Sequence, residues 1–333
     1  MPAVFGVLLL GVHPFALAVA GLIAGHASWA QTTGTAAYPS KPIRMISSLA
    51  AGGGNDTSAR IIAQKLTDAW GQQVVVENRP GAGGTIAAES AVRAPADGYT
   101  LLMASMSLAI TPSIYKLAYD PARELAAVTL VVLSPSVLVV HPSLPVHSVK
   151  ELIAFARARP DELLWSSSGN GSSQHLAMEL FNRMAGVKLM HVAYKGTAPS
   201  MTDLIGGRVS VSAASAISTM PHVKAGKLRA LAVISAHRSP AVPELPTVAE
   251  AGVPGYAVDT WYGLFAPAAT PKDIVAKLYE EIGRTLKQPE MKDKLASIGL
   301  EPVGTPPGEF AVYVRAEIDK WGRVVREAGV HIN

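Results

Sequence analysis

Two glycine-rich turns, each followed by a helical segment, carry the residues best suited to bind a ligand. The first turn, Gly52–Gly54, follows an apolar strand and precedes a helix predicted over Thr57–Trp70, whose polar cap comes from Asn55, Asp56, Thr57 or Ser58. The second turn, Ser166–Ser173, precedes another helical segment. A glycine-rich turn at a helix start leaves backbone N–H groups and the positive end of the helix dipole free for an anion. Two such turns, far apart in the sequence, predict capture of a negatively charged ligand between two lobes.

The sequence lacks the motifs that would indicate catalysis, nucleotide binding or metal binding. No G-x-x-x-x-G-K-[ST] or G-x-G-x-x-G pattern occurs, and no G-x-S-x-G elbow accompanies the serines near His175. The nine histidines do not have H-x-x-x-H or H-E-x-x-H spacing. We therefore predict a protein that is not an enzyme and needs no metal or cofactor. The rival hypothesis is a hydrolase that uses Ser172 or Ser173 with His175.

The composition is that of a globular chain large enough for two α/β lobes. Of the 333 residues, 49% are hydrophobic and 16% are charged, which lies outside the range of disordered proteins. The net charge of +4 comes without a Lys/Arg block, so nucleic acid is not a predicted partner. The absence of cysteine excludes disulfides and thiolate chemistry.

The N-terminal segment resembles an export signal. The first charged side chain is Lys41, and an apolar run covers Phe5–Ala24. Small residues stand at Ser28 and Ala30, which predicts a signal peptide over residues 1–30 that is cleaved after Ala30. The alternative is an uncleaved membrane anchor, because roughly 20 apolar residues can span a bilayer.

The rest of the chain alternates short apolar strands with amphipathic helices. The first series is predicted at Pro42–Ser47, Thr57–Trp70, Val74–Glu77, Thr85–Arg93 and Tyr99–Ala104. Such a β-α-β-α-β series implies a parallel sheet covered by helices on both faces.

A second series begins after the β-branched run Val128–Val140, which Ser134-Pro135 interrupts. Its predicted elements are helices at Val149–Arg159 and Ser172–Met184, and strands at Leu163–Ser166, Leu189–Ala193, Val209–Ala213 and Leu228–Ile234. A strand at Thr260–Ala266 and helices at Pro271–Leu286 and Gly308–Glu327 return to the first lobe. The predicted fold is α/β, with lobe 1 at residues 38–138 and 264–333 and lobe 2 at residues 139–263. The two crossings between the lobes form a hinge.

Several motifs in one order indicate a known family. They are YPSKPIR, AGGGNDTSARIIAQKL, VVVENRPGAGG, DGYTLL, SSSGNGSSQHLAMELF, HVAYKGTAP, AGKLRALAV and PTVAEAGVPGY. Together they resemble the extracytoplasmic solute-binding receptors of tripartite tricarboxylate transporters, the Bug family, over residues 38 to 330. The resemblance implies a two-lobed periplasmic-binding-protein fold of type II with a two-crossing hinge. It also implies a periplasmic monomer that captures an organic di- or tricarboxylate, or an aromatic carboxylate, and delivers it to a two-subunit membrane permease.

The resemblance also implies the ligand contacts. In lobe 1 they fall on Leu49, Ala50, Gly52, Gly53, Asn55, Asp56, Gly83, Ser105 and Ser107. In lobe 2 they fall on Ser168, Gly169, Ser172, His175, Tyr194, Lys195 and Gly196. Two departures matter: the family commonly has Pro-Phe where this chain has Ser48-Leu49, and relatives often carry an Asp near Ala214. Without that Asp, we do not expect an amino-acid ligand.

Three positions have a structural alternative to a ligand contact. His175 is interpreted as a polar, hydrogen-bonding residue at the start of its helix, and Tyr194-Lys195 could equally form a solvated loop. Trp261-Tyr262 is predicted to pack the hinge. A receptor of the same fold that feeds a signalling kinase rather than a permease remains an alternative function.

Overall fold

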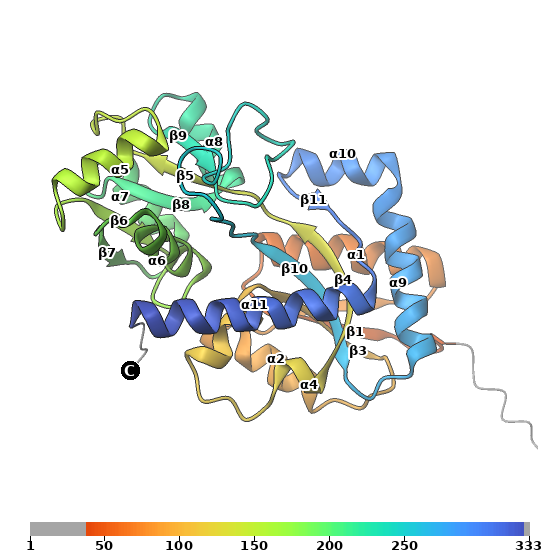
Figure 1. The fold of residues 1–333 in the computed structure, drawn as a ribbon. Coiled ribbons are helices and arrows are strands. Elements are labelled where there is room, and N and C mark those ends of the chain that lie inside the picture. The colour runs from red at the N-terminus through yellow and green to blue at the C-terminus, as the bar shows by residue number, and fades with distance from the viewer. Residues whose placement is uncertain (1–37, 330–333) are drawn as a thin grey trace, which may run out of the picture. The chain divides into compact units, whose positions relative to one another are not determined.

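The computed structural model describes residues 38–329, and these residues form two mixed β-sheets with surrounding helices (Figure 1). The predicted signal peptide over residues 1–30 lies outside the described residues. None of the helices between residues 38 and 329 is long and apolar enough to cross a membrane.

The first sheet has the strand order β11-β4-β10-β3-β1-β2. Its strands are β1 (Ile43–Ser47), β2 (Val74–Asn78), β3 (Thr100–Ser105), β4 (Leu125–Leu133), β10 (Trp261–Pro267) and β11 (Glu301–Pro302). β1 pairs in parallel with β2 and β3, as the β-α-β-α-β pattern predicts, whereas β10 runs antiparallel to β3 and β4. The sheet is therefore mixed, because a strand from the far end of the chain inserts between β3 and β4.

Helices accompany this sheet. They are α1 (Gly54–Trp70), α2 (Thr85–Val92), α3 (Ser107–Ile110), α4 (Pro121–Glu124), α9 (Lys272–Lys287), α10 (Pro289–Ser297) and α11 (Pro307–Ala328), with 3₁₀ turns at Ala82–Gly84 and Thr111–Ser113. Helix α11 packs on β4 and also on α6 of the second sheet's region, so it touches both halves of the fold (Figure 1). Its Trp321 is fully buried, and its Lys320 donates to the Ala257 carbonyl at 2.8 Å.

The second sheet has the strand order β7-β6-β8-β5-β9. Its strands are β5 (Ser136–Val140), β6 (Leu164–Ser167), β7 (Met190–Ala193), β8 (Val211–Ser215) and β9 (Arg229–Val233). Its helices are α5 (Val149–Ala158), α6 (Ser173–Ala185), α7 (Thr197–Ile205) and α8 (Ala216–Lys224). β6 is parallel to β7 and β8, and β5 is antiparallel to β8 and β9.

The chain passes between the two sheets twice, along adjacent segments. It leaves the first sheet at Ser134-Pro135, between β4 and β5, and returns through Thr260 into β10. The Ser134 N–H donates to the Thr260 carbonyl at 2.7 Å, so the two crossings are hydrogen-bonded to each other. The predicted lobe boundaries, after residues 138 and 263, fall inside β5 and β10.

The start of α1 differs from the sequence prediction. The helix begins at Gly54 rather than Thr57, and its N-cap is Gly53, which has no side chain to cap it. The prediction of a polar cap at Asn55, Asp56, Thr57 or Ser58 was therefore wrong, because these residues lie inside the helix. The glycine cap has a consequence for the site, since no side chain covers the N–H groups of the first turn.

Candidate functional site

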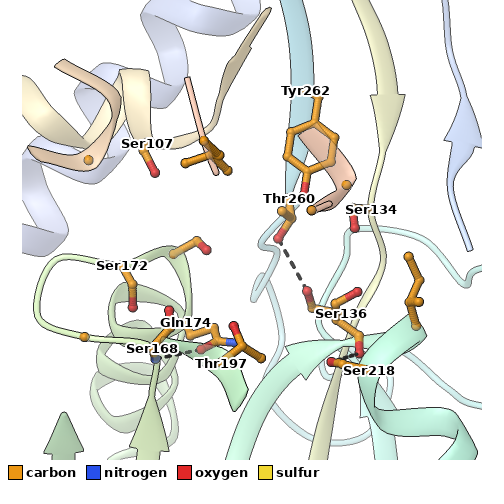
Figure 2. A pocket seen from close by; sticks show the side chains of 18 of the residues that line it. Ser107, Ser134, Ser136, Ser168, Ser172, Gln174, Thr197, Ser218, Thr260 and Tyr262 are labelled. Carbon is orange, nitrogen blue, oxygen red and sulfur yellow. Dashed lines mark hydrogen bonds between the residues drawn. The ribbon is translucent and has the colours of Figure 1, made fainter. Parts of the chain in front are cut away.

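A cavity of about 670 Å³ lies where the two sheets face each other across the crossing segments (Figure 2). Lobe 1 contributes Leu49, Gly52, Gly53, Gly54, Thr57, Gly83, Ser107, Thr111, Tyr115, Tyr262, Ile298 and Leu300. Lobe 2 and the crossings contribute Ser134, Ser136, Ser168, Gly169, Asn170, Gly171, Ser172, Ser173, Gln174, Thr197, Ser215, Ile217, Ser218 and Thr260. Among the described residues that form its wall, none is Asp, Glu, Lys, Arg or His. The wall is neutral, and hydroxyl groups and glycine backbone dominate it.

Several helices begin at this wall. α1, α6 and α7 start at Gly54, Ser173 and Thr197, which all line the cavity, and α8 starts between the lining residues Ser215 and Ile217. The first backbone N–H groups of a helix have no partner within the helix, and its N-terminus carries a partial positive charge of about half an elementary charge. Four helix starts thus give a neutral wall a positive potential, supplied by backbone dipoles instead of basic side chains.

The first turn, Gly52–Gly54, is built so that backbone faces the cavity. Gly53 has φ −83° and ψ 171°, which any residue can adopt, and a Cβ there would meet only the Ala50 carbonyl at 3.7 Å. At Gly54, in contrast, a Cβ would lie 2.9 Å from the ring of Tyr262. Gly54 therefore allows the helix start to pack against Tyr262, and at Gly53 the space that a side chain would fill is open.

Asn55 and Asp56, both predicted ligand contacts, do not line the cavity and instead hold this turn. Asn55 accepts from the Ser47 hydroxyl at 2.8 Å and donates to the Met103 carbonyl. Asp56 accepts from the Gly52 N–H at 2.9 Å and pairs with Arg60 at 3.0 Å. Burial would raise the pKa of Asp56, but the bonds from Gly52, Arg60 and Asn78 outweigh it and keep that pKa below its usual value. The carboxylate is thereby kept ionised and neutralised by Arg60.

The second turn, Ser168–Ser173, lines the cavity along its whole length. The side chains of the following helix hold it in place. The Ser168 N–H donates to Gln174 Oε1 at 2.8 Å, and the Gly171 N–H donates to His175 Nδ1 at 3.0 Å. The Ser172 hydroxyl caps α6 by accepting from the His175 N–H at 3.2 Å. Many of the hydrogen-bonding groups of this turn are thus engaged within the protein, where they fix the conformation of the turn.

His175 is buried beneath the turn and is not part of the cavity wall. Its ring stacks on His191 with centroids 4.1 Å apart, and His191 stacks on Trp165 at the same spacing. His191 is hydrogen-bonded to the Ser167 hydroxyl at 2.7 Å. Burial and the neighbouring His175 lower the pKa of His191 to about 4, so this stack is held with a neutral His191 at physiological pH.

The same geometry gives no support to the hydrolase hypothesis. A nucleophilic serine needs its hydroxyl bonded to the imidazole of the base. Within residues 38–329, the Ser172 hydroxyl bonds a backbone N–H, and the imidazole Nδ1 of His175 is occupied by Gly171. The other ring nitrogen of His175 faces Glu179 at 3.7 Å.

The structure brings half of the predicted site residues to the cavity wall: Leu49, Gly52, Gly53, Gly83, Ser107, Ser168, Gly169 and Ser172. The others are not lining residues: Ala50, Asn55, Asp56, Ser105, His175, Tyr194, Lys195 and Gly196. Tyr194 donates its hydroxyl to Asp203 at 2.7 Å, and the Gly196 N–H donates to the Ser168 carbonyl at 3.0 Å. The Ser105 hydroxyl oxygen is a long 3.4 Å from the Ser107 N–H.

Sequence reasoning missed lining residues in both lobes, among them Thr111, Tyr115, Thr197, Ile298 and Leu300, and two further groups show why. The first is the hydroxyl groups of the crossings, Ser134, Ser136 and Thr260, whose only signal was their place at the interruption of a β-branched run and at a strand start. The second is the start of α8, with Ile217 and Ser218, because that helix was not predicted. Tyr262, predicted to pack the hinge, is largely buried but also faces the cavity (Figure 2).

The chain has two α/β lobes and a polar cavity beside the two segments that connect them, which is the architecture of a solute-binding receptor. Known proteins of similar sequence belong to the same class. The family model described as "Tripartite tricarboxylate transporter family receptor" matches residues 58–330. Protein BugT of Bordetella pertussis is 37% identical over 322 residues, covering 95% of this chain and 98% of BugT.

Two solved structures are similar over nearly the whole described chain. The structure titled "R. palustris Rpa4515 with adipate" is 39% identical with a TM-score of 0.78, covering 89% of this chain and 100% of that one. The periplasmic binding protein BugD is 33% identical with a TM-score of 0.75, covering 89% of this chain and 100% of that one.

The chain belongs to the tripartite tricarboxylate transporter receptor family. It is a solute-binding receptor with a two-lobed α/β fold, not an enzyme, which confirms the function class and the fold predicted from the sequence.

Proposed function

We propose that this receptor binds an organic carboxylate in the cavity between its lobes, in the periplasm, and delivers it to a two-subunit membrane permease. The observation that carries the proposal is the meeting of four helix starts on a wall without a charged side chain. A carboxylate can accept hydrogen bonds from such N–H groups and from hydroxyls, and the helix dipoles favour its charge. A neutral solute could accept the same hydrogen bonds, but each would be weaker because the solute carries no charge.

The energetics of such a site are sufficient for capture. Each hydrogen bond to a charged group contributes about 1.5–3 kcal/mol. Binding in the micromolar range requires about 8 kcal/mol. A few of these bonds from the N–H groups of Gly53 and Gly54 and from the serine hydroxyls of the Ser168–Ser173 turn, together with hydrocarbon contacts, supply that free energy even after the cost of closing the lobes. No arginine is needed.

Similar proteins support the class of ligand and the compartment. The R. palustris protein was solved with adipate, a carboxylate, and BugD is named a periplasmic binding protein. We extend both to this chain, with residues 1–30 as the signal peptide and the two sheets as lobes that close like a hinge. The lining residues from the predicted set contact the ligand, and Asn55, Asp56 and His175 hold the turns in position.

A thermal-shift screen tests this function. The purified receptor is heated with a panel of organic acids and, separately, with the corresponding neutral amides. We expect one or more acids to raise the melting temperature and their amides to have little effect, because binding to the folded state alone stabilises it. Equal stabilisation by acid and amide would refute the anion site.

A further inference from the structure

Tyr262 is held rigidly at the point where the chain returns from the second crossing to lobe 1. It is the second residue of β10, and its backbone pairs with Ser105 of β3 and Val132 of β4. The residue is largely buried and lines the cavity. In Figure 2, the ring extends from β10 with its hydroxyl group pointing towards Thr260 and Ser134. The hydroxyl group therefore reaches the cavity beside the crossings.

The Tyr262 hydroxyl group also lies against the start of α1. A Cβ built on Gly54, the first residue of the helix, would be 2.9 Å from Tyr262 Oη and 2.9 Å from its Cε2. Cα–Cβ bonds in an α-helix tilt towards the N-terminus, so Oη lies on the N-terminal side of the first turn. The free backbone N–H groups of that turn point to the same side. A carboxylate bound at this helix start is therefore close to the Tyr262 hydroxyl group.

The chemical form of the Tyr262 hydroxyl group makes it a hydrogen-bond donor. Burial raises the pKa of the phenol above its usual 10.0, and the Ser134 hydroxyl group, which acts in the opposite direction, does not cancel this effect. The phenol is therefore protonated at physiological pH. A hydroxyl group lowers that pKa by donating to the phenol oxygen, so the Tyr262 O–H remains available to donate to a ligand.

We infer that Tyr262 is a ligand-binding residue, whose hydroxyl group donates to the same carboxylate that the start of α1 binds. This inference rests on the proposed function and adds a side-chain donor to the backbone N–H groups of Gly53 and Gly54. An ionised carboxylate has two oxygens and about four lone-pair sites, so it can accept from the helix start and from the phenol together. The packed ring forms this bond without the entropy cost of ordering a mobile side chain. Because β10 follows the second crossing directly, the bond connects the ligand to the hinge.

Tyr262→Phe tests the inference, because it removes one oxygen atom and keeps the ring. The acid that gives the largest thermal shift is titrated into each receptor by isothermal titration calorimetry. We expect Kd to rise about tenfold or more in Tyr262→Phe, since a hydrogen bond to a charged group is lost. An ultraviolet difference spectrum is also recorded with the acid at saturation. We expect a tyrosine signal in the unmodified receptor that is greatly reduced in Tyr262→Phe, whereas a purely structural role of Tyr262 would leave that signal in place.

The matched control is Tyr119→Phe. Tyr119 is buried and is not a lining residue, and its hydroxyl oxygen has no hydrogen-bond partner among the residues that the structure describes. We expect this variant to keep the Kd and the tyrosine signal of the unmodified receptor, and circular dichroism with a thermal melt to show that both variants fold. A Kd for Tyr262→Phe within twofold of the unmodified receptor, an equal loss of affinity in Tyr119→Phe, or a tyrosine signal retained in Tyr262→Phe would overturn the role of Tyr262 while leaving the carboxylate site intact. If no acid binds better than its amide, the proposed function fails, and this inference fails with it.

Discussion

Substitution of Gly53 separates ligand binding from folding more sharply than any other change in the first turn. Because Gly53 has an ordinary φ of −83° and open space where a Cβ would stand, Gly53→Val should be accommodated by the fold. Loss of a glycine N-cap costs up to about 1 kcal/mol, and the reduced freedom of the unfolded chain returns about 0.4–1 kcal/mol. The free energy of unfolding should therefore change by less than about 1 kcal/mol.

The affinity for the ligand, in contrast, should fall strongly in Gly53→Val. The valine methyl groups would occupy the space from which a carboxylate reaches the N–H groups of Gly53 and Gly54. Loss of two charge-assisted hydrogen bonds costs at least about 3 kcal/mol, which is about a 100-fold rise in Kd. Gly53→Ala, with a single methyl, should lose about one such bond, or about tenfold.

The assay is calorimetric titration of the acid that gives the largest thermal shift, alongside urea unfolding of each variant. Gly283→Val is the matched control. Gly283 lies in α9 and is not a lining residue, and a Cβ added to it would have no other atom within 4 Å. A Kd for Gly53→Val within twofold of the unmodified receptor would refute the assignment of this turn to the ligand. A loss of affinity in Gly283→Val of the same size would show that the effect is not local.

Three further predictions concern stability. Gly263→Ala should destabilise the first sheet by about 1–3 kcal/mol in urea unfolding, since its Cβ would lie 2.2 Å from the buried ring of Phe310; unchanged stability would mean that the ring relaxes freely. Ser172→Ala removes the cap on the His175 N–H and should cost about 1 kcal/mol, and a melting temperature equal to that of the unmodified receptor would contradict this. His191 has a folded-state pKa of about 4, below its usual 6.5, so its contribution to stability is complete above pH 6.5 and is lost as the pH falls towards 4. Because the ring is partly exposed, we expect the stability lost between pH 7 and pH 5 to be smaller in His191→Gln by about 1 kcal/mol, and parallel pH profiles would argue against a neutral His191.

The strongly periodic parts of the fold could be predicted from the sequence. The strands and helices of the first α/β series, the interruption at Ser134-Pro135 and the long helix α11 follow from apolar spacing and turn residues. The mixed order of the sheets could not be predicted this way, because the position of β10 between β3 and β4 depends on pairing across most of the chain. Helices α3, α4, α7, α8 and α10 were not predicted, since each has nine residues or fewer and a short helix carries little periodic signal.

The candidate site was predicted best where backbone conformation forms the cavity wall. Glycines and serines in the turns around Gly53 and Ser168 do line the cavity, since their small size and their place before a helix are local properties. Asn55, Asp56 and His175 are polar and close in sequence, but their side chains turn inwards to bond the turns themselves. A residue's place next to a binding turn does not show whether its side chain contacts the ligand or holds the turn. The two roles differ in the direction in which the side chain points, which the sequence does not give.

The neutral cavity wall has a consequence for the conditions under which the receptor can work. Binding sites built from lysine and arginine lose affinity as dissolved salt rises, because exposed charges are screened over about 10 Å at 0.1 M ionic strength. Here the described wall carries no ionic side chain, and its donors act at contact distance. Affinity should therefore fall less with dissolved salt than it does in a site built from lysine and arginine, because only the helix dipoles remain to be screened.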